Sequence, residues 1–251
     1  MESPELEIKP PGKNWNFLKV NVILFIAASC IYFIYDLAMG DRIKSRDSVE
    51  KILITGHKKL SKEEIIHLLD LKQGLSIKDY NLDEIEERVK EHPRIKDARL
   101  VQRSGTRLLL SIIERDARFI VNTGDNLYEI DEDFNIISSN FVVDTSVIIL
   151  SGDFSFNPKN NKDTKFRDFA ETVWENFGQF PVLMDRISEV VLGSDGEISI
   201  FIYRPMRMKV LMGDTLNRKQ VRKLYSSLAY FEKKKNKVGL LDLRGDDAVY
   251  Y

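Results

Sequence analysis

The side chains that could carry out acid–base or metal chemistry are few in this sequence. Its three histidines, His57, His67 and His92, stand apart from one another, and none belongs to an H-E-x-x-H pair on one helix face. The single cysteine, Cys30, allows neither an internal disulfide nor a cysteine-based zinc site. The sequence therefore predicts no metal centre and no cofactor.

One pair of residues has the spacing of a catalytic nucleophile. Ser48 and Lys51 match the S-x-x-K pattern of penicillin-binding enzymes, but no S-D-N or K-T-G sequence accompanies them. The pair also falls at the start of an expected strand, where alternation would point the two side chains apart. Because G-x-S-x-G, P-loop and G-x-G-x-x-G sequences do not occur either, we expect no catalytic site and no small-molecule substrate.

Three adjacent acids, Asp131, Glu132 and Asp133, are candidates for calcium binding because carboxylate oxygens are the ligands that calcium prefers. They fall at the tip of an expected hairpin, however, and acids in that position usually form a solvated turn. We therefore favour a turn over a calcium site.

The composition describes an ordinary globular protein. The chain has 251 residues, 43% of them hydrophobic and 31% charged, which is enough for one or two domains with their own cores. Lys and Arg number 38 against 39 Asp and Glu, so no basic field favours general nucleic-acid binding. Two packed domains without a catalytic set are expected to bind other proteins.

Residues 20–40 contain the most apolar run, "VNVILFIAASCIYFIYDLAM". At 1.5 Å per residue this run is just long enough to cross a bilayer core about 30 Å thick. Tyr32 and Tyr35 lie towards its end, where aromatic rings favour the interface, and Asp36 marks the end of the hydrocarbon part. We expect residues 1–19 to be a short tail and residues 20–40 to be one transmembrane helix.

Three other interpretations of this run stay open: a buried core helix, a signal peptide cleaved at Ala38-Met39-Gly40, and a lipoprotein cleavage box at Ala27-Ala28-Ser29-Cys30. The long leader argues against a signal peptide, and the apolar "IYFIY" after Cys30 argues against a lipoprotein. Lysines and arginines are balanced on the two sides of the run, so charge leaves its orientation open.

A first folded unit is expected over residues 48–116, with the order β-α-α-β-β. Its two helices have clear start signals, because Ser61 with Glu64 makes an S-x-x-E capping box and Asn81 with Glu84 has the same spacing. The strands are residues 49–56, which alternate and end in a turn at Gly56, and residues 95–103 and 107–115, which form a hairpin.

A second unit is expected over residues 117–251. Short strands alternate with turns from "RFIVN" to "SVIILSGD", and more strands follow in "ISEVVLGS", "EISIFIY" and "MRMKVLMG". Two helices are expected, "FRDFAETVWENF" and one that opens at Asp214 or Thr215. Their predicted buried stripes are Phe166, Phe169, Ala170, Val173, Trp174 and Phe177 in the first, and Val221, Leu224, Tyr225, Leu228 and Phe231 in the second.

The second helix ends in a cluster of lysines, Lys233, Lys234, Lys235 and Lys237, which suits the negative end of a helix dipole. A membrane or nucleic-acid patch is the alternative. After them, "KVGLLDLRGDDAVYY" alternates, turns over Gly-Asp-Asp and alternates again. We expect Val238, Leu240 and Leu241 to face the core, and Asp242 and Arg244 to face solvent.

These features together resemble a known family. A β-α-α-β-β unit after a single anchor resembles a POTRA domain, and "VEKILITGHKKLSKEEI", "HPRIKDARLVQR" and "LLLSIIERDARFIV" resemble the FtsQ/DivIB family of bacterial division proteins. "LYEIDEDFNII", "VIILSG" and "KVGLLDLRGDDAVYY" extend the resemblance to the C-terminus. Two positions depart from the family pattern: Asp116 stands where the family usually has Pro, and Gly245 where it has an aromatic residue.

The resemblance implies an α+β fold: one N-terminal transmembrane helix, a POTRA domain over residues 48–116, and a mixed β-sheet domain with two helices over residues 117–251. It also implies a bacterial inner-membrane protein that crosses once, with a cytoplasmic N-terminus and its bulk outside, at the division septum. Its role would be a scaffold for other division proteins, not an enzyme.

The resemblance further implies that the last strands dock an FtsB/FtsL-like coiled-coil pair. The corresponding residues here are Arg244, Gly245, Asp246, Asp247, Ala248, Val249, Tyr250 and Tyr251. An exposed sheet edge is able to accept an added strand, and tyrosines are favoured at binding hot spots. The alternative is that the last strand pairs internally and the two tyrosines merely cover the core.

A second contact, with upstream division components, is implied around Gly56 and His57. Two rival functions stay open beside the scaffold: a membrane-anchored periplasmic cell-wall enzyme, and a ligand-sensing ectodomain. The enzyme would need a pocket of converging polar groups, and the sensor would usually need a longer cytoplasmic module than 19 residues.

Overall fold

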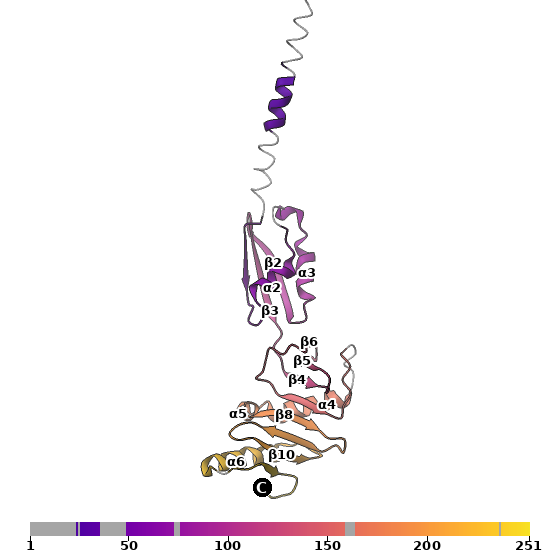
Figure 1. Ribbon diagram of the computed structural model, residues 1–251, viewed down its shortest axis with the longest axis vertical. Coiled ribbons are helices and arrows are strands. Elements are labelled where there is room, and N and C mark those ends of the chain that lie inside the picture. The colour runs from indigo at the N-terminus through magenta and orange to yellow at the C-terminus, as the bar shows by residue number, and fades with distance from the viewer. Residues whose placement is uncertain (1–23, 25, 36–48, 73–75, 159–163, 236) are drawn as a thin grey trace, which may run out of the picture.

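The computed structural model describes residues 24, 26–35, 49–72, 76–158, 164–235 and 237–251. The chain forms two lobes that follow one another along an elongated molecule (Figure 1). Helical residues 26–35 lie beyond the upper lobe, whereas the C-terminus lies at the opposite end, in the lower lobe.

Most of the transmembrane helix predicted over residues 20–40 lies outside the described residues, as does the whole tail of residues 1–19. Residues 26–35 of the span are helical, and their side chains are exposed. Within the described ranges no helix combines the length and the apolar character that a membrane crossing requires. The membrane span therefore stays a prediction.

The upper lobe has the predicted β-α-α-β-β order. Its elements are β1 (Lys51–Thr55), α2 (Lys62–Leu69), the 3₁₀ turn η1 (Ile77–Asp79), α3 (Leu82–Lys90), β2 (Ile95–Ser104) and β3 (Arg107–Glu114). The sheet order is β1-β3-β2, in which β1 runs parallel to the central β3 and β2 runs antiparallel to it. Both helices bury their apolar stripes against one face of this sheet.

The helix start signals explain this local structure. Ser61 and Glu64 form the predicted reciprocal box, in which the Ser61 amide donates to the Glu64 carboxylate at 2.8 Å and the Glu64 amide donates to Ser61 Oγ at 3.2 Å. Asn81 makes a simpler cap, because its side-chain oxygen accepts from the amide of Asp83 and its NH₂ group donates to Glu84.

The lower lobe is one mixed sheet covered by helices. Its strands are β4 (Phe119–Asn122), β5 (Leu127–Ile130), β6 (Ile136–Ser139), β7 (Ile149–Gly152), β8 (Ile187–Leu192), β9 (Ile198–Ile202), β10 (Met208–Gly213), β11 (Leu240–Asp242) and β12 (Val249–Tyr250). Its helices are α4 (Thr164–Phe177), α5 (Pro181–Met184) and α6 (Arg218–Lys234). The strand order is β12-β11-β10-β9-β8-β7-β4-β5-β6. Burial alternates along β9 and β10, so one face of the sheet carries the core and the other faces solvent.

Three details of the lower lobe correct the sequence-based expectations. The last helix begins at Arg218, not at Asp214 or Thr215, because Asn217 and Gln220 form a reciprocal capping box there. Tyr225 is 46% exposed, so it lies outside the buried stripe of α6. A third, short helix, α5, was not predicted.

Trp174 was predicted to belong to the buried stripe of α4 but lies outside it, since this residue is 39% exposed at the junction of the two lobes. The guanidinium group of Arg118 stacks on its ring at 4.5 Å from the centroid, which uses the exposed face for a cation–π contact. Sequence periodicity cannot separate a core residue from one at the margin of the same stripe.

A buried ion pair joins the lobes. Arg94, directly before β2, donates to Glu129 on β5 across the junction, and both side chains are almost completely buried. Glu129 also accepts from Ser138 Oγ at 2.7 Å and from the amides of Val143 and Asp144 at 2.8 and 2.7 Å. The carboxylate of Glu129 therefore ties the upper lobe to three segments of the lower one.

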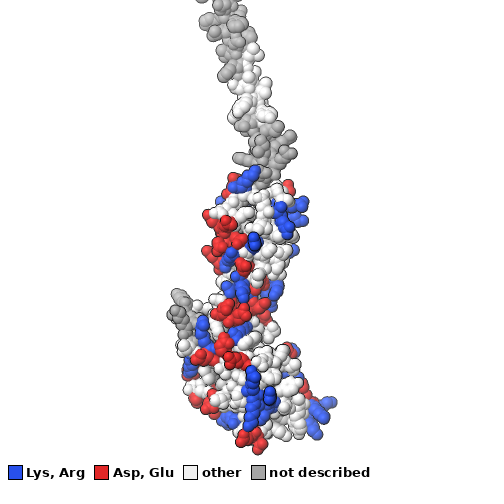
Figure 2. Space-filling model, turned by 180° about the vertical axis from the view of Figure 1, so that it is seen from behind, with Lys and Arg blue, Asp and Glu red and all other residues white. Residues whose placement is uncertain are grey.

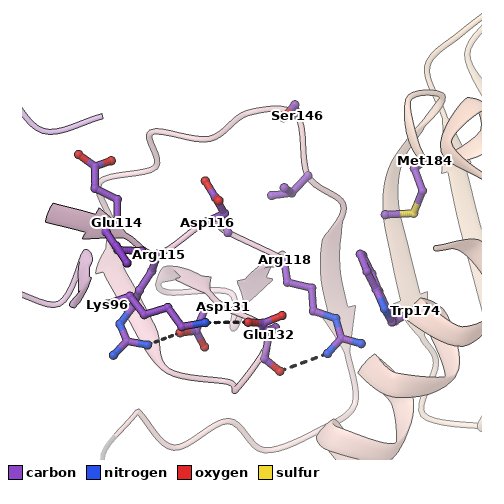
Figure 3. Close-up of a pocket in the computed structure, with 13 residues that line it drawn as sticks. Lys96, Glu114, Arg115, Asp116, Arg118, Asp131, Glu132, Ser146, Trp174 and Met184 are labelled. Atoms are coloured by element: carbon purple, nitrogen blue, oxygen red, sulfur yellow. Dashed lines mark hydrogen bonds and ion pairs between the residues drawn. The ribbon is translucent and has the colours of Figure 1, made fainter. Parts of the chain in front are cut away.

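More exposed ion pairs surround this contact. Lys59 pairs with Asp144 at 3.4 Å, and Lys96 pairs with Glu132 at 2.9 Å. Figure 2 shows the resulting mixture of acidic and basic side chains at the waist of the molecule. The close-up in Figure 3 shows Lys96 directed towards Glu132. The junction is thus held by charge as well as by the single chain connection.

Asp131 corrects a further expectation. The acids at residues 131–133 were predicted to form a solvated turn, yet Asp131 is buried, and it pairs with Arg115 at 2.6 Å (Figure 3). Its other oxygen accepts from the amides of Asp133 and Asn135 at 3.0 and 2.8 Å. The buried carboxylate of Asp131 therefore stabilises the turn through these contacts.

The environment of Glu129 favours its charged form. Burial alone would raise the pKa of Glu129, but the hydrogen bonds from Asp144, Ser138, Val143 and Arg94 outweigh it and hold the pKa below its ordinary value. The unfolded pKa of Glu is about 4.3, so the stabilisation is complete above that pH and is lost as the pH falls through the lowered folded pKa.

Glu129→Gln should lower the free energy of unfolding at pH 7 by about 3–5 kcal/mol, because it leaves the charge of Arg94 buried without its partner. Chemical denaturation measures the loss. The difference from the wild type should begin to shrink below about pH 4.3, where Glu129 of the unfolded chain takes up a proton, and should be lost as the pH falls through the lowered pKa of the folded state. The matched control Glu132→Gln breaks an exposed pair and should leave stability nearly unchanged. Equal losses of stability from the two substitutions would contradict the claim that the buried Arg94–Glu129 pair stabilises the protein.

Gly56→Ala should destabilise the upper lobe strongly. Gly56 has φ +87°, and a Cβ there would overlap the carbonyl oxygen of Ile112 on β3. Gly105 also has positive φ, but a Cβ there would meet no atom within 4 Å. Gly105→Ala is therefore the control, with an expected cost of about 1 kcal/mol from backbone conformation alone. Thermal unfolding of both variants tests this. A Gly56 variant as stable as the control would show that the backbone at Ile112 moves aside at little cost in free energy.

Candidate functional site

The C-terminal hairpin ends the large sheet. β11 runs parallel to β10, and β12 pairs antiparallel with β11 in the register Leu241↔Tyr250 and Asp242↔Val249. β12 is the first strand in the sheet order, so its backbone has a neighbour on one side. Its other side is an edge.

The hydrogen bonds show which backbone groups this edge exposes. Tyr251 and Leu240 exchange bonds, with N–H···O distances of 3.0 Å and 3.4 Å in the two directions. In an antiparallel ladder such bonded residues alternate with residues whose N–H and C=O groups point the other way. The backbone groups of Ala248 and Tyr250 therefore point away from β11, where an added strand would pair with them.

The side chains of β12 are accessible. Val249 and Tyr250 are 45% and 46% exposed, and Tyr251 is 75% exposed. The ring of Tyr250 still contacts Phe231 of α6 edge to face, with 5.1 Å between centroids. Tyr250 thus holds the short strand against the domain while part of its ring stays open to a partner.

The turn before β12 is fixed by α6 and by salt bridges. Lys223 Nζ donates to the backbone carbonyls of Gly245 and Asp246 at 2.7 and 2.9 Å. Arg244 pairs with Asp242 at 2.8 Å, and hydrogen bonds from the Arg244 side chain and backbone lower the pKa of the Asp242 carboxyl. The hairpin is therefore positioned before any partner arrives.

Gly245 imposes no backbone requirement of its own. A Cβ at Gly245 would come no nearer than 4.0 Å to the carbonyl oxygen of Asp247, and the turn would hold a side chain there. No close backbone contact therefore requires glycine at the position where the family resemblance leads one to expect an aromatic residue.

The prediction of which residues of β11 face the core is partly wrong. Leu241 and Leu243 are fully buried, whereas Leu240 is half-buried on the other face. The register explains this, because Leu241 pairs beside Val210 of β10, whose side chain is in the core. Val238 is buried as predicted.

The structure places the two predicted sites in different lobes. Residues 244–251 come together in one hairpin of the lower lobe, while Gly56 and His57 belong to a loop of the upper lobe. The carboxylate of Glu114 fixes this loop by accepting from the amides of Lys58, Lys59 and Leu60 at 2.9, 2.8 and 3.1 Å.

The residues with potential chemistry do not converge. In the part of the chain that the structure describes, no three His, Cys, Asp or Glu residues are grouped as metal ligands. His92 Nδ1 accepts from the amide of Arg94 at 3.2 Å, and burial together with the charge of Arg94 lowers its pKa. Ser48, of the S-x-x-K pair, lies outside the described residues, and Lys51 opens β1.

A cleft of about 470 Å³ lies at the junction of the lobes (Figure 3). Its four carboxylates have partners: Asp131 pairs with Arg115, Glu132 with Lys96, and Glu114 accepts from the loop amides, while the exposed Asp116 lies 3.5 Å from Lys58. A general base must be free to approach a substrate, whereas these side chains are engaged in contacts within the protein. The cleft therefore has the character of an interdomain contact.

Sequence reasoning missed two groups of residues. The Arg94–Glu129 pair carries no local signal, since its members are 35 positions apart. The cations at the start of α6 do have one: "RKQVRK" at residues 218–223 repeats a basic pair at the four-residue helical spacing.

A β-α-α-β-β lobe precedes a mixed sheet whose last strand, β12, has a neighbouring strand on one side only. Residues 48–115 match the family described as POTRA domain, FtsQ-type. A stretch of 92 residues is 30% identical to cell division protein FtsQ of Rickettsia bellii (strain RML369-C), and covers 37% of this chain and 34% of that protein.

Both matches support the resemblance to the FtsQ/DivIB family that the sequence motifs predicted. The matched stretch spans about a third of the length of the curated relative. The POTRA prediction is confirmed by the family match and by the observed strand order.

Tyr250→Ala should loosen the terminal strand, because it removes the ring that packs on Phe231. The amide of Tyr251, which donates to Leu240, should then exchange its hydrogen faster with solvent. Tyr251→Ala removes a more exposed ring of the same kind and should leave that exchange rate close to wild type. Hydrogen exchange followed by NMR checks both, and identical rates in the two variants would show that Tyr250 does not hold the strand.

Proposed function

We propose that this chain is a non-enzymatic scaffold of the bacterial division machinery. It crosses the inner membrane once through residues 20–40, with the N-terminus in the cytoplasm and both lobes outside. At the septum it recruits and links other division proteins. The edge strand β12 docks an FtsB/FtsL-like coiled-coil pair through residues 244–251.

The observation that carries this proposal is the free side of β12. The backbone groups of Ala248 and Tyr250 point away from β11, and the turn is held in place by Lys223. A partner strand gains main-chain hydrogen bonds there without any rearrangement of the domain. The exposed rings of Tyr250 and Tyr251 provide apolar contact area beside those bonds.

The proposal includes a second contact with upstream division components at Gly56 and His57. His57 Nδ1 is buried and has no hydrogen-bond partner within the described ranges. The loop itself is fixed by Glu114, so it would present a stable surface. The match to cell division protein FtsQ and the FtsQ-type POTRA domain of residues 48–115 support a role in division.

The rival functions lack an observation in their favour. A cell-wall enzyme needs converging groups with a free acid or base, and the junction cleft holds carboxylates that are already paired. A ligand sensor needs an enclosed binding cavity, and the junction cleft is crossed by the ion pairs that join the lobes.

The test uses the full-length chain in detergent and an FtsB/FtsL-like pair from the same organism. Ala248→Pro removes the N–H that points out of the edge, but it leaves the bonds between β12 and β11 and adds little bulk. We expect at least a tenfold weaker affinity, about 1.4 kcal/mol, measured by surface plasmon resonance.

Ala248→Ser is the matched control, because it keeps the N–H and should bind like wild type. Both variants should unfold at the wild-type temperature, since neither touches the core. Wild-type affinity of Ala248→Pro would refute docking by strand addition. A fluorescent fusion that fails to gather at the septum of dividing cells would refute the division role as a whole.

A further inference from the structure

Helix α6 carries an unusual concentration of positive charge for a chain whose net charge is −1. Its 17 residues include one carboxylate, Glu232, and six cations: Arg218, Lys219, Arg222, Lys223, Lys233 and Lys234. Figure 2 shows Lys and Arg side chains gathered on the lower lobe. The four cations of residues 218–223 are called the α6 basic cluster below.

The positive charges of the α6 basic cluster destabilise the part of the helix that carries them. The N-terminus of a helix is the positive end of its dipole, where acids are favoured, yet the first turn of α6 contains no acid and two cations. In addition, Arg218 with Arg222 and Lys219 with Lys223 are like charges at the i,i+4 spacing, which destabilises a helix. This arrangement of charges destabilises α6 in two ways, through the helix dipole and through repulsion between like charges. It therefore indicates a role in contacts outside the helix.

Few of these charges are neutralised within the protein. Lys219 is 77% exposed, and its pair with Asp246 spans 3.5 Å between two exposed groups. Arg218 and Arg222 are exposed, and they form no ion pair with the described residues. Lys223 donates to two uncharged backbone carbonyls of the turn and not to a carboxylate.

The cluster lies along the proposed docking edge. The backbone carbonyls of residues 245 and 246 accept hydrogen bonds from Lys223, and the ring of Tyr250 packs on Phe231 further along the same helix. Helix α6 therefore runs beside the terminal hairpin from its turn to the last strand. A strand added to β12 would bring its flanking residues close to this helix. A shallow hollow lined by Lys219, Arg222, Lys223, Ser226 and Ser227 marks the exposed surface there.

We propose that the α6 basic cluster is a second contact surface for the partner of β12, and that it binds an acidic segment of that partner next to the added strand. This inference rests on the proposed function of the edge. Opposite charges at this place would guide the partner into register with β12 and speed its association, whereas the strand bonds would set how long it stays.

A polypeptide fits this surface better than a lipid headgroup. α6 and the C-terminus lie at the end of the molecule farthest from residues 26–35, which belong to the predicted membrane span (Figure 1). A basic surface meant for the same membrane would be expected near that span, because the attraction fades within a Debye length of about 10 Å.

The test reverses the two charges that have no structural role, in the double variant Arg218→Glu/Arg222→Glu. Folding should be preserved, because an acid in the first turn suits the helix dipole. The control, Arg103→Glu/Arg107→Glu, makes the same charge change at exposed positions in the upper lobe. Association with the FtsB/FtsL-like pair is measured by stopped flow at low and high salt, with the full-length chain in detergent.

The α6 double variant should associate about tenfold more slowly at low salt, with a flatter salt dependence and a dissociation rate near wild type, as expected for lost electrostatic steering. The control should behave like wild type. Equal association rates for all three proteins would overturn the inference even if Ala248→Pro abolishes binding. If Ala248→Pro binds normally, the edge model itself fails.

A separate arm uses vesicles of phosphatidylglycerol and phosphatidylcholine. No difference in vesicle binding between the wild type and the α6 double variant is expected. Loss of vesicle binding in that variant, with partner association unchanged, would assign the cluster to lipid and refute the acidic polypeptide.

Discussion

The need of every backbone N–H and C=O group for a hydrogen-bond partner governs the C-terminal end of this protein. Within the sheet of the lower lobe, each strand from β11 to β5 has a neighbouring strand on both sides, whereas β12, like β6 at the opposite edge, has one. Natural proteins usually protect such an edge with charge or cover. Here the edge is short, held from below by Phe231 and Lys223, and leaves the groups of Ala248 and Tyr250 directed outwards. A prepared edge of this kind lets a partner bind with little loss of conformational entropy.

The second constraint is the connection between the lobes. A buried charge is tolerated when it is paired and hydrogen-bonded, and Glu129 meets this condition with Arg94, Ser138 and two backbone amides. This pair and the ion pairs around it make the relative placement of the lobes specific. This would serve the proposed scaffold role, because two binding surfaces at a fixed separation would bring their partners into a defined geometry.

Much of the fold follows from local sequence signals. The capping box at Ser61 predicted the start of α2, and alternation with a Gly-containing turn predicted the hairpin of β2 and β3. The start of α6 was misplaced, because Asp214 and Thr215 are equally good caps in isolation and the reciprocal bond of Asn217 with Gln220 decides. Trp174 and Leu240 were assigned to the core because periodicity gives a face and not its depth. Arg94 and Glu129 escaped notice because only the tertiary fold brings them together.

The central claim is that the outward-facing groups of β12 form hydrogen bonds with a partner strand. The most direct measurement is amide hydrogen exchange of the full-length chain with and without an FtsB/FtsL-like pair, read at Ala248 and Tyr250. The account predicts that both amides exchange rapidly in the free protein and become strongly protected in the complex, while the amide of Tyr251, already bonded to Leu240, changes little. A complex that forms while the amides of Ala248 and Tyr250 stay unprotected would contradict it.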